Sequence, residues 1–316
     1  MAGIPRLGFL GSIALDSIFS VPTVPVAGER VFGTLLGQYN GGMAANQAVE
    51  AARYSTEVYL LGAIGNDAIG KRLDADLQAR GVHTDRLVSR ADAFSGQTFM
   101  HLVNEKSDYF SIVTPGANML LDPEALKQAV AKLRGGALLI SLEVNADAVA
   151  AAISAAKSAG VYVYLVCSPA EKVTPAYLSS ADALVCNFRE ANMLLGLRRG
   201  SVRDMAQQLR DYTGPQSRLL ITLGSDGALL FEAGNVYYAP AMHVTCLDSV
   251  GAGDAFIGAF AALRIQGISP YHALSCGCIA GAMAVSVIGP QSSAHTAAQV
   301  EAQYQALYKD KKGVIL

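Results

Sequence analysis

The chain has 316 residues, of which 52% are hydrophobic and 16% charged, and its formal net charge is −2. This length and composition allow a sizeable buried core and exclude a disordered protein. The near-neutral charge gives no electrostatic basis for binding nucleic acid or an anionic membrane surface, so neither is expected as a partner. Five cysteines without zinc-type spacing and an N-terminus without a signal pattern indicate buried thiols and a soluble, cytoplasmic protein.

The first predicted element is a short buried strand over residues 6–13, which ends in small residues. Asp16 follows at its carboxyl end, where open α/β sheets bind ligands, although a solvated loop aspartate is the alternative interpretation. Segments 17–40 and 95–114 lack helix periodicity, and together they predict a small, separate antiparallel sheet.

Gly41 and Gly42 precede a helix predicted over residues 43–54. The glycines permit close approach of the backbone to a ligand. Asn46, in the first turn, offers both a donor and an acceptor to a pair of hydroxyl groups. The alternative is an ordinary helix start with an incidental asparagine.

Strands and helices alternate from residue 56 onward, which predicts a parallel, doubly wound sheet. The expected strands and helices are 56–62, 67–80, 123–133, 136–142, 145–159, 161–167, 182–186 and 188–195. Glu143 follows the strand predicted over 136–142. It is either a site residue or a glutamate that the dipole of the next helix favours at its N-terminus. Asn187 and Glu190 follow another strand and form a capping-box pattern, which is compatible with a site as well. A buried strand over 219–223 and a hairpin over 228–232 and 235–240 then predict one edge of the sheet.

The stretch Asp-Ser-Val-Gly-Ala-Gly-Asp over 248–254 predicts a loop that opens a helix over 252–264. The backbone amides of Gly251, Ala252 and Gly253 would point outward at the positive end of the helix dipole, where an anion can bind. Asp254 would then be placed to take a proton from a hydroxyl group that attacks a phosphate. The alternative is a capping aspartate on an ordinary helix, with glycines for packing.

An uncharged segment over 273–294 contains Gly-x-x-x-Gly and imitates a membrane helix. Its many Gly, Ser and Ala residues and the interruption at Gly289-Pro290 favour instead a buried helix over 270–285 that packs closely on its neighbour. A last amphipathic helix is predicted over 297–309.

Two of these motifs carry a family resemblance. The stretch Asp-Ser-Val-Gly-Ala-Gly-Asp-Ala-Phe over 248–256 resembles the C-terminal signature of the PfkB carbohydrate kinases, the ribokinase-like family. Gly-Gly-Met-Ala-Ala-Asn-Gln-Ala over 41–48 resembles their second signature, in the right order and spacing. The resemblance implies one α/β domain over 1–316, with a doubly wound, mostly parallel sheet flanked by helices. It also implies that 17–40 and 95–114 form a β lid that closes over a sugar and often makes a homodimer interface.

The resemblance further implies an ATP-dependent kinase that phosphorylates a primary hydroxyl group of a small sugar. Asp254 would be the general base, and the amides of Gly251, Ala252 and Gly253 would form the anion hole. The implied acceptor contacts are Asp16, Gly41, Gly42, Asn46, Glu143 and Asp254. The implied ATP contacts are Asn187, Thr222, Gly224, Gly227, Gly251, Gly253 and Cys278. Glu190 would hold Mg²⁺ through water. A monovalent cation such as K⁺ would bind Asp248, Val250, Ala284, Val287, Gly289 and Ser293. The alternative is that Val287, Gly289 and Ser293 lie in an ordinary surface loop.

Three positions depart from the family pattern. Ribokinases usually carry Asn at position 14 and Lys at position 43, where this chain has Ala14 and Met43, and a Pro where it has Cys186. The first two changes make the expected pocket less polar than a ribose site. A nucleoside kinase of the same family and a non-catalytic sugar-binding homologue therefore stay open as alternatives. The missing Gly-x-Gly-x-x-Gly fingerprint speaks against a nicotinamide-dependent dehydrogenase.

Overall fold

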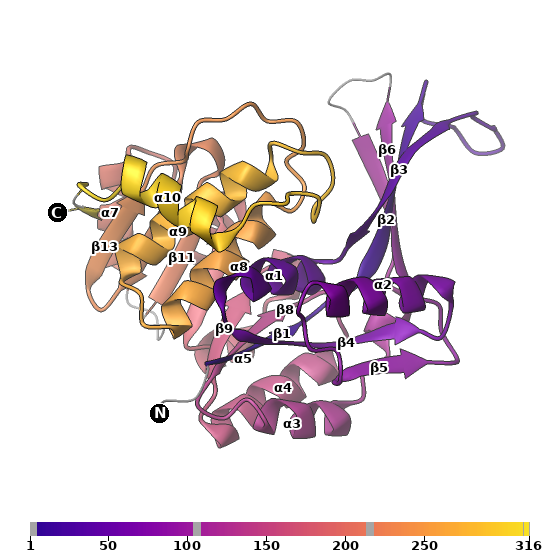
Figure 1. Cartoon of the computed structure of the whole chain (residues 1–316), viewed down its shortest axis with the longest axis horizontal. Helices are drawn as coiled ribbons and strands as arrows, with labels where there is room; N and C mark the ends of the chain where they lie inside the picture. The colour runs from indigo at the N-terminus through magenta and orange to yellow at the C-terminus, as the bar shows by residue number, and fades with distance from the viewer. Residues whose placement is uncertain (1–4, 104–108, 213–217, 312, 316) are drawn as a thin grey trace.

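A ten-stranded sheet runs through the middle of the molecule in the order β14-β13-β12-β11-β10-β9-β8-β1-β4-β5 (Figure 1). The computed structural model describes residues 5–103, 109–212, 218–311 and 313–315, so 104–108 of the expected lid lie outside the described residues. Neighbouring strands from β11 to β5 pair in parallel, and β12, β13 and β14 form an antiparallel edge. The strands of this sheet are β1 (Arg6–Leu10), β4 (Glu57–Gly65), β5 (Leu87–Arg90), β8 (Ala137–Ser141), β9 (Tyr162–Val166), β10 (Ala183–Asn187), β11 (Arg218–Thr222), β12 (Ala228–Glu232), β13 (Asn235–Ala239) and β14 (Val314–Ile315).

Helices cover both faces of this sheet, so its parallel strands are buried on both sides and read as continuous apolar runs. One core lies under α1 (Met43–Ala51), α2 (Ala68–Ala79), α8 (Ala252–Ile265), α9 (Pro270–Ala284) and α10 (Ala297–Leu307). The opposite core lies under α3 (Pro123–Ala131), α4 (Ala146–Ala159), α5 (Pro175–Ser180), α6 (Phe188–Leu195) and α7 (Val202–Arg210). Short 3₁₀ turns are η1 (Ala52–Tyr54), η2 (Gly116–Met119), η3 (Ala170–Lys172) and η4 (Gly224–Asp226).

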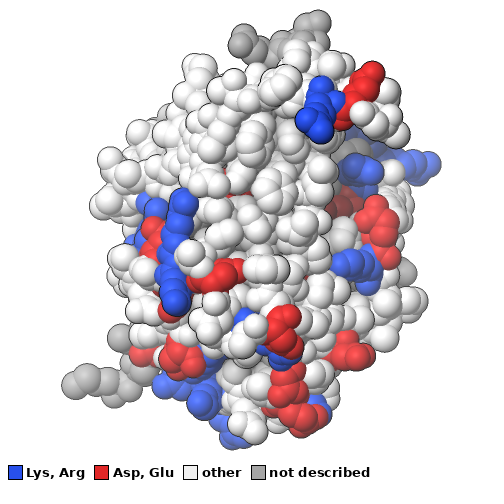
Figure 2. All heavy atoms as spheres, turned by 90° about the vertical axis from the view of Figure 1, so that its right-hand side faces the viewer, with Lys and Arg blue, Asp and Glu red and all other residues white. Residues whose placement is uncertain are grey.

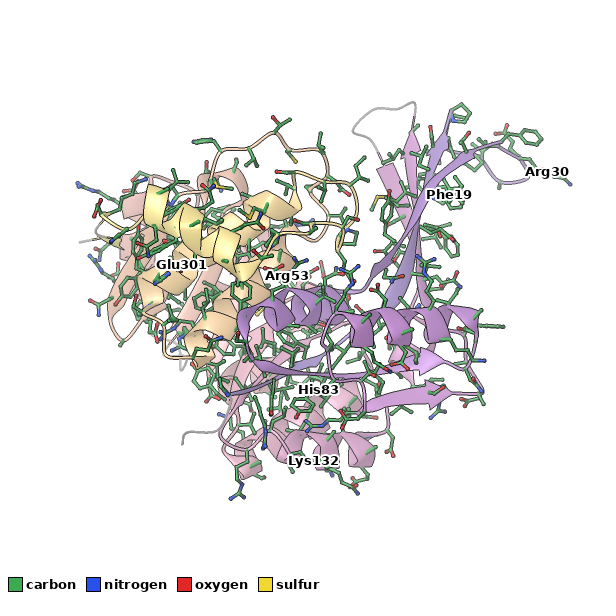
Figure 3. All side chains as sticks on the ribbon, in the orientation of Figure 1. Phe19, Arg30, Arg53, His83, Lys132 and Glu301 are labelled. Carbon is green, nitrogen blue, oxygen red and sulfur yellow. The ribbon has the colours of Figure 1, made fainter. Side chains whose placement is uncertain are left out.

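A second, four-stranded sheet projects away from the helices, and we call it the lid sheet (Figure 1). Its order is β3-β2-β6-β7, with β2 (Ala14–Val21), β3 (Thr34–Gly41), β6 (Gly96–Val103) and β7 (Tyr109–Thr114). The two outer pairings are antiparallel, as expected, and the central pairing of β2 with β6 is parallel. The rings of Phe19, His101 and Phe110 stack across three strands with centroid separations of 5.3 and 4.5 Å. Figure 3 shows Phe19 on the lid sheet and Arg30 out at the end of the β2–β3 connection.

The predicted alternation of strands and helices is confirmed, with most boundaries within two residues. The first strand is shorter than predicted, because β1 ends at Leu10 and the chain soon enters the lid sheet as β2. Asn118 explains this change of sheet: its side chain accepts from the Ile13 N–H at 3.0 Å and donates to the Ile13 carbonyl at 2.9 Å. Asp16 therefore lies in strand β2 rather than in a loop.

Four elements were not predicted: β5, α5, α7 and β14. The first two and β14 are too short to show a clear period, whereas α7 was missed although Val202, Met205, Ala206 and Leu209 repeat with a helical period. The uncharged segment that imitates a membrane helix forms α9, whose close packing on α8 is visible at Gly277. A Cβ there would lie 2.9 Å from the ring of Phe256. Within the described ranges, we find no helix with the length and apolarity that a membrane crossing requires.

Candidate active site

A cavity of about 540 Å³ lies between the lid sheet and the main sheet. We call it the large cavity. Its polar lining side chains are Ser12, Asp16, Asn46, Gln97, Thr98, Thr114, Asn118, Glu143, Lys172 and Asp254, and its apolar ones include Ala14, Met43, Met100, Val113 and Met119. The structure thus brings Asp16, Asn46, Glu143 and Asp254, which come from four separate parts of the sequence, to one space. Gly42 lines the same cavity.

Two glycines allow α1 to begin directly against the residues that follow β1. Gly42 has φ 94°, and a Cβ on it would lie 2.6 Å from the carbonyl oxygen of Ser12. A Cβ on Gly41 would collide with the carboxyl group of Asp16. Position 42 therefore requires glycine, because any side chain would displace the start of α1 from the backbone after β1, and a side chain at position 41 would displace the carboxyl group of Asp16.

Asp254 is held by two amide donors from α1. Asn46 Nδ2 donates to Asp254 Oδ2 at 2.9 Å, and Gln47 Nε2 donates to Asp254 Oδ1 at 3.0 Å. Gln291 Nε2 in turn donates to Asn46 Oδ1 at 2.8 Å. Gln291 thus uses one of the two lone pairs on Asn46 Oδ1, and Asp254 uses one of its two N–H groups, so Asn46 keeps one acceptor site and one donor for a ligand, as expected from the sequence.

Carboxyl groups crowd the large cavity and favour each other's protonated forms. Burial raises the pKa of Asp254 to about 7, with added repulsion from Glu143 and Asp16, although the Asn46 and Gln47 hydrogen bonds oppose the rise. Burial also raises the pKa of Asp16 to about 6; Glu143 adds to this rise, and the hydrogen bond with Thr98 opposes it. A carboxyl group whose pKa lies near neutral pH is suited to accept a proton during a reaction.

Ser12 connects Glu143 to the start of α1. Its hydroxyl group donates to Glu143 Oε2 and accepts from the backbone N–H of Met43 at 2.9 Å. Glu143 is therefore fixed at the cavity wall by a residue from the loop that follows β1. Sequence patterns alone did not identify the roles of Ser12, Gln47, Thr98, Asn118, Lys172 or Gln291. Gln47 could have been identified most easily, because it follows Asn46 in the same motif; it is 1% exposed.

A second cavity of about 330 Å³ lies on the other side of the α8 N-terminus. Five predicted nucleotide contacts line it: Thr222, Gly224, Gly227, Gly253 and Cys278. Much of the remaining lining is apolar, including Met242, Val244, Phe256 and Val285. Asn187 and Gly251 are not part of this lining. Asn187 instead caps α6, where it forms the expected capping box with Glu190 at 2.8 and 2.9 Å.

The first turn of α8 separates the two cavities. Ala252 and Gly253 line the second cavity, whereas Val250 and Asp254 line the large one. Gly251 precedes the helix with φ 79°, and a Cβ on it would lie 2.7 Å from Pro290, so this position requires glycine. A Cβ on Gly253 would meet no atom of the described residues within 4 Å. An anion can therefore approach the exposed amides of this turn without a steric barrier.

The residues expected to hold metal ions offer oxygen atoms, as hard cations prefer. Burial raises the pKa of Glu190, which lies just after β10. Asp248 connects the loop before α8 with the loop after α9, because its carboxylate accepts from the Val250 N–H at 3.0 Å and from the Gly289 N–H at 2.9 Å. Gln291 Oε1 is buried without a hydrogen-bond partner among the described residues. These donor sets fit a hydrated Mg²⁺ at Glu190 and a monovalent cation at Asp248.

Comparisons with known proteins identify the family and the fold of the chain. The profile of the family described as "pfkB family carbohydrate kinase" matches residues 9–297. The chain is 30% identical over 292 residues to a ribokinase of Haemophilus influenzae, covering 92% of this chain and 95% of that protein. It is also 30% identical over 292 residues to a deoxyribokinase of Salmonella typhimurium, covering 91% and 94%. A solved ribokinase structure from Arabidopsis thaliana, complexed with ribose and ATP, superposes with a TM-score of 0.84 at 26% identity, covering 95% of this chain and 98% of that one.

Proposed function

The chain belongs to the pfkB family of carbohydrate kinases, and we propose that it transfers the γ-phosphoryl group of ATP to a primary hydroxyl group of a small sugar. One observation carries the proposal: the start of α8 lines both cavities, with Ala252 and Gly253 at the second cavity and Asp254 at the large cavity. A nucleotide in the second cavity and a sugar in the large cavity would therefore meet at this turn.

Each protein group has a defined part in the proposed transfer. The Asp254 carboxylate takes the proton of the attacking hydroxyl group as the new oxygen–phosphorus bond forms and the bond from the γ-phosphorus to ADP breaks. The amides of Gly251, Ala252 and Gly253 stabilise negative charge on the γ-phosphoryl oxygens. Asp16, Gly42, Asn46 and Glu143 hold the other hydroxyl groups of the acceptor, with Gly41 supporting the position of Asp16.

The proposed function also includes two metal ions, and the roles of the side chains described above stay the same with them. Glu190 would hold a hydrated Mg²⁺, which would supply neutralisation of charge on the triphosphate. Asp248, Ser293 and the carbonyls of Val250, Ala284, Val287 and Gly289 would hold a monovalent cation such as K⁺, which would supply order in the loop before α8. Asn187, Thr222, Gly224, Gly227 and Cys278 are the proposed ATP contacts from the rest of the chain.

The acceptor site favours a sugar with fewer hydroxyl groups than ribose. Ala14 and Met43 both line the large cavity, at positions where a polar side chain would otherwise reach a sugar hydroxyl. An apolar wall cannot repay the desolvation of a hydroxyl group, so a deoxy sugar loses less on binding. A nucleoside is the second candidate, favoured by the additional apolar lining from Met100, Val113 and Met119.

ADP release with Mg-ATP and K⁺, measured over pentoses, deoxy sugars, hexoses and nucleosides, tests the function. We expect one strong responder among the pentoses and deoxy sugars. A nucleoside as the single responder would replace the sugar by the second candidate. No responder at all, with ATP still bound, would contradict the proposal.

The pH dependence of turnover follows from the raised pKa of Asp254. The base must be deprotonated, and its pKa is about 7, so activity is lost as the pH falls through this value and reaches a plateau above it. We expect kcat/KM to rise about tenfold per pH unit below the apparent pKa. Rates in constant-ionic-strength buffers from acid to weakly alkaline pH measure this. A flat profile across neutral pH would argue against Asp254 as the base.

The lid sheet carries an exposed apolar surface that we propose pairs two copies of the chain. Large apolar side chains are exposed on β3, on β7 and in the β2–β3 connection: Val24, Val26, Phe32, Leu35, Leu36 and Ile112. Figure 2 shows few charged side chains on the upper part of the face from which the lid sheet projects. Light scattering should therefore give twice the chain mass of 33.0 kDa, and Leu36→Asp should give the monomer. A monomeric wild-type protein at micromolar concentration would refute this.

A further inference from the structure

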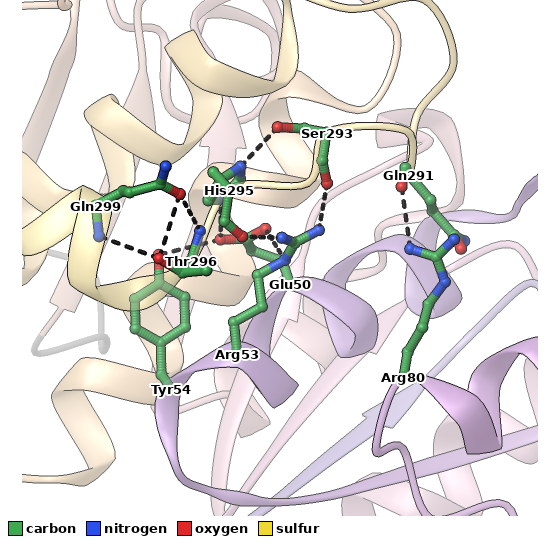
Figure 4. Close-up of polar contacts among 9 residues, drawn as sticks. All are labelled: Glu50, Arg53, Tyr54, Arg80, Gln291, Ser293, His295, Thr296 and Gln299. Atoms are coloured by element: carbon green, nitrogen blue, oxygen red, sulfur yellow. Dashed lines mark hydrogen bonds and ion pairs between the residues drawn. The ribbon is translucent and has the colours of Figure 1, made fainter.

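A buried polar cluster attaches α1 to the segment that follows α9. Glu50 and His295 are 4% and 8% exposed, and His295 Nε2 lies 2.9 Å from Glu50 Oε1 (Figure 4). The hydroxyl group of Tyr54 donates to the same carboxylate oxygen at 3.0 Å. The two buried partners come from positions 245 residues apart, so this contact fixes the segment against α1 from a distant part of the chain.

Arg53 strengthens the attachment through the backbone of the same segment. Its Nε lies 3.1 Å from Glu50 Oε2, which balances the charge of the buried carboxylate. Its terminal nitrogens donate to the carbonyl of Ser293 at 2.6 Å and to the carbonyl of His295 (Figure 4). The backbone on both sides of residue 294 is therefore held in one position.

The same contacts determine which way the hydroxyl group of Ser293 points. An ionised Glu50 can only accept, so His295 Nε2 carries the proton of that contact and a neutral imidazole has its lone pair on Nδ1. Ser293 Oγ lies 2.7 Å from His295 Nδ1 and donates to it. The hydroxyl oxygen of Ser293 then keeps its lone pairs for another partner, such as a cation. Without the His295 Nδ1 acceptor, the hydroxyl proton of Ser293 can turn toward that cation instead.

We infer that His295, oriented by Glu50, is a positioning residue that makes Ser293 a cation ligand. Its Nδ1 accepts the hydroxyl proton of Ser293, so that the Ser293 oxygen keeps its lone pairs for the monovalent cation. This inference rests on the cation site of the proposed function. Partners behind a metal ligand typically change metal affinity by about 10- to 100-fold when they are removed. His295 has this relation to Ser293, although it contributes no ligand atom itself.

The test is the thermal unfolding midpoint of the whole chain as a function of KCl concentration, with choline chloride holding the ionic strength constant. The variants are His295→Gln, Glu50→Gln and Ser293→Ala. Glu50→Gln keeps an acceptor for His295 and removes the charge that fixes the imidazole tautomer. We expect His295→Gln to raise the K⁺ concentration for half-maximal stabilisation about tenfold or more, with Ser293→Ala raising it at least as much.

His272→Gln is the matched control, because His272 pairs with Glu301 at 2.8 Å in a similar His–Glu contact between α9 and α10. Figure 3 shows Glu301 on α10, apart from Arg53. This control should keep the wild-type K⁺ dependence. A wild-type K⁺ dependence in both His295→Gln and Glu50→Gln, with a weakened one in Ser293→Ala, would refute the positioning role and leave the cation site intact. A wild-type protein that K⁺ does not stabilise more than choline would overturn the cation site and the inference with it.

Discussion

Asp254→Asn should lower kcat by about 10²- to 10⁴-fold while ATP binding stays close to wild type. The substitution preserves the size of the side chain and removes the group that takes the hydroxyl proton. Asp254 lines the large cavity and not the second one, so the proposed nucleotide contacts are unchanged. Steady-state turnover gives the loss of kcat, and calorimetric titration with an ATP analogue gives the affinity.

Asp122→Asn is the control for this variant, because Asp122 is an exposed cap at the start of α3, where asparagine caps equally well. It should keep wild-type turnover and ATP affinity. Turnover of Asp254→Asn within a few-fold of wild type would remove Asp254 as the base. A joint loss of ATP binding would mean instead that the variant disturbs the first turn of α8.

Gly253→Ala should lower kcat about 100-fold, since misplacing the reacting groups by about 1 Å typically has this effect. The added methyl group would occupy the open space over the α8 amides, where the γ-phosphoryl group is proposed to lie. The fold should be unaffected, because Gly253 is helical, its Cβ position is free and alanine is the better helix former. The measurement pairs kcat with the thermal unfolding midpoint.

Gly251→Ala separates this steric effect from a structural one. Gly251 has φ 79° and lies against Pro290, so alanine there should lower the unfolding midpoint as well as turnover. Gly253→Ala should lower turnover alone. Full activity in Gly253→Ala would show that no phosphate group needs the space above this residue.

Local sequence patterns were sufficient for the strands of the main sheet other than β5 and β14. Buried strands such as Leu138–Ile140 read as continuous apolar runs, and the turn at Gly251 was recognisable because glycine and small residues precede a helix period. The same patterns misplaced Asp16, because the chain between β1 and β2 is held by Asn118, 105 residues away, whose side chain accepts from the Ile13 N–H. The parallel pairing of β2 with β6 has the same origin, since no local signal records which distant strand lies alongside.

The residues that hold the candidate site residues in place could not be predicted from the sequence, because their contacts also join distant parts of the chain. Gln291 and His295 follow α9 in a segment that resembles a surface loop, and their importance lies in contacts with Asn46 and Glu50 on α1. The polar character of Asn46 was visible, but the use of its acceptor by Gln291 was not. Individual polar residues can be found from sequence, whereas the division of their hydrogen bonds between protein and ligand requires the tertiary structure.

Phosphorus NMR of the reaction product tests the central claim most directly, because it reports both the transfer and the carbon that receives the phosphate. The enzyme is incubated with Mg-ATP, K⁺ and the best acceptor of the panel, with Asp254→Asn in parallel. The account predicts a new phosphomonoester resonance coupled to two protons, as in a CH₂–O–phosphate group, and its loss in Asp254→Asn. Coupling to a single proton, or release of inorganic phosphate alone, would contradict transfer to a primary hydroxyl group at this site.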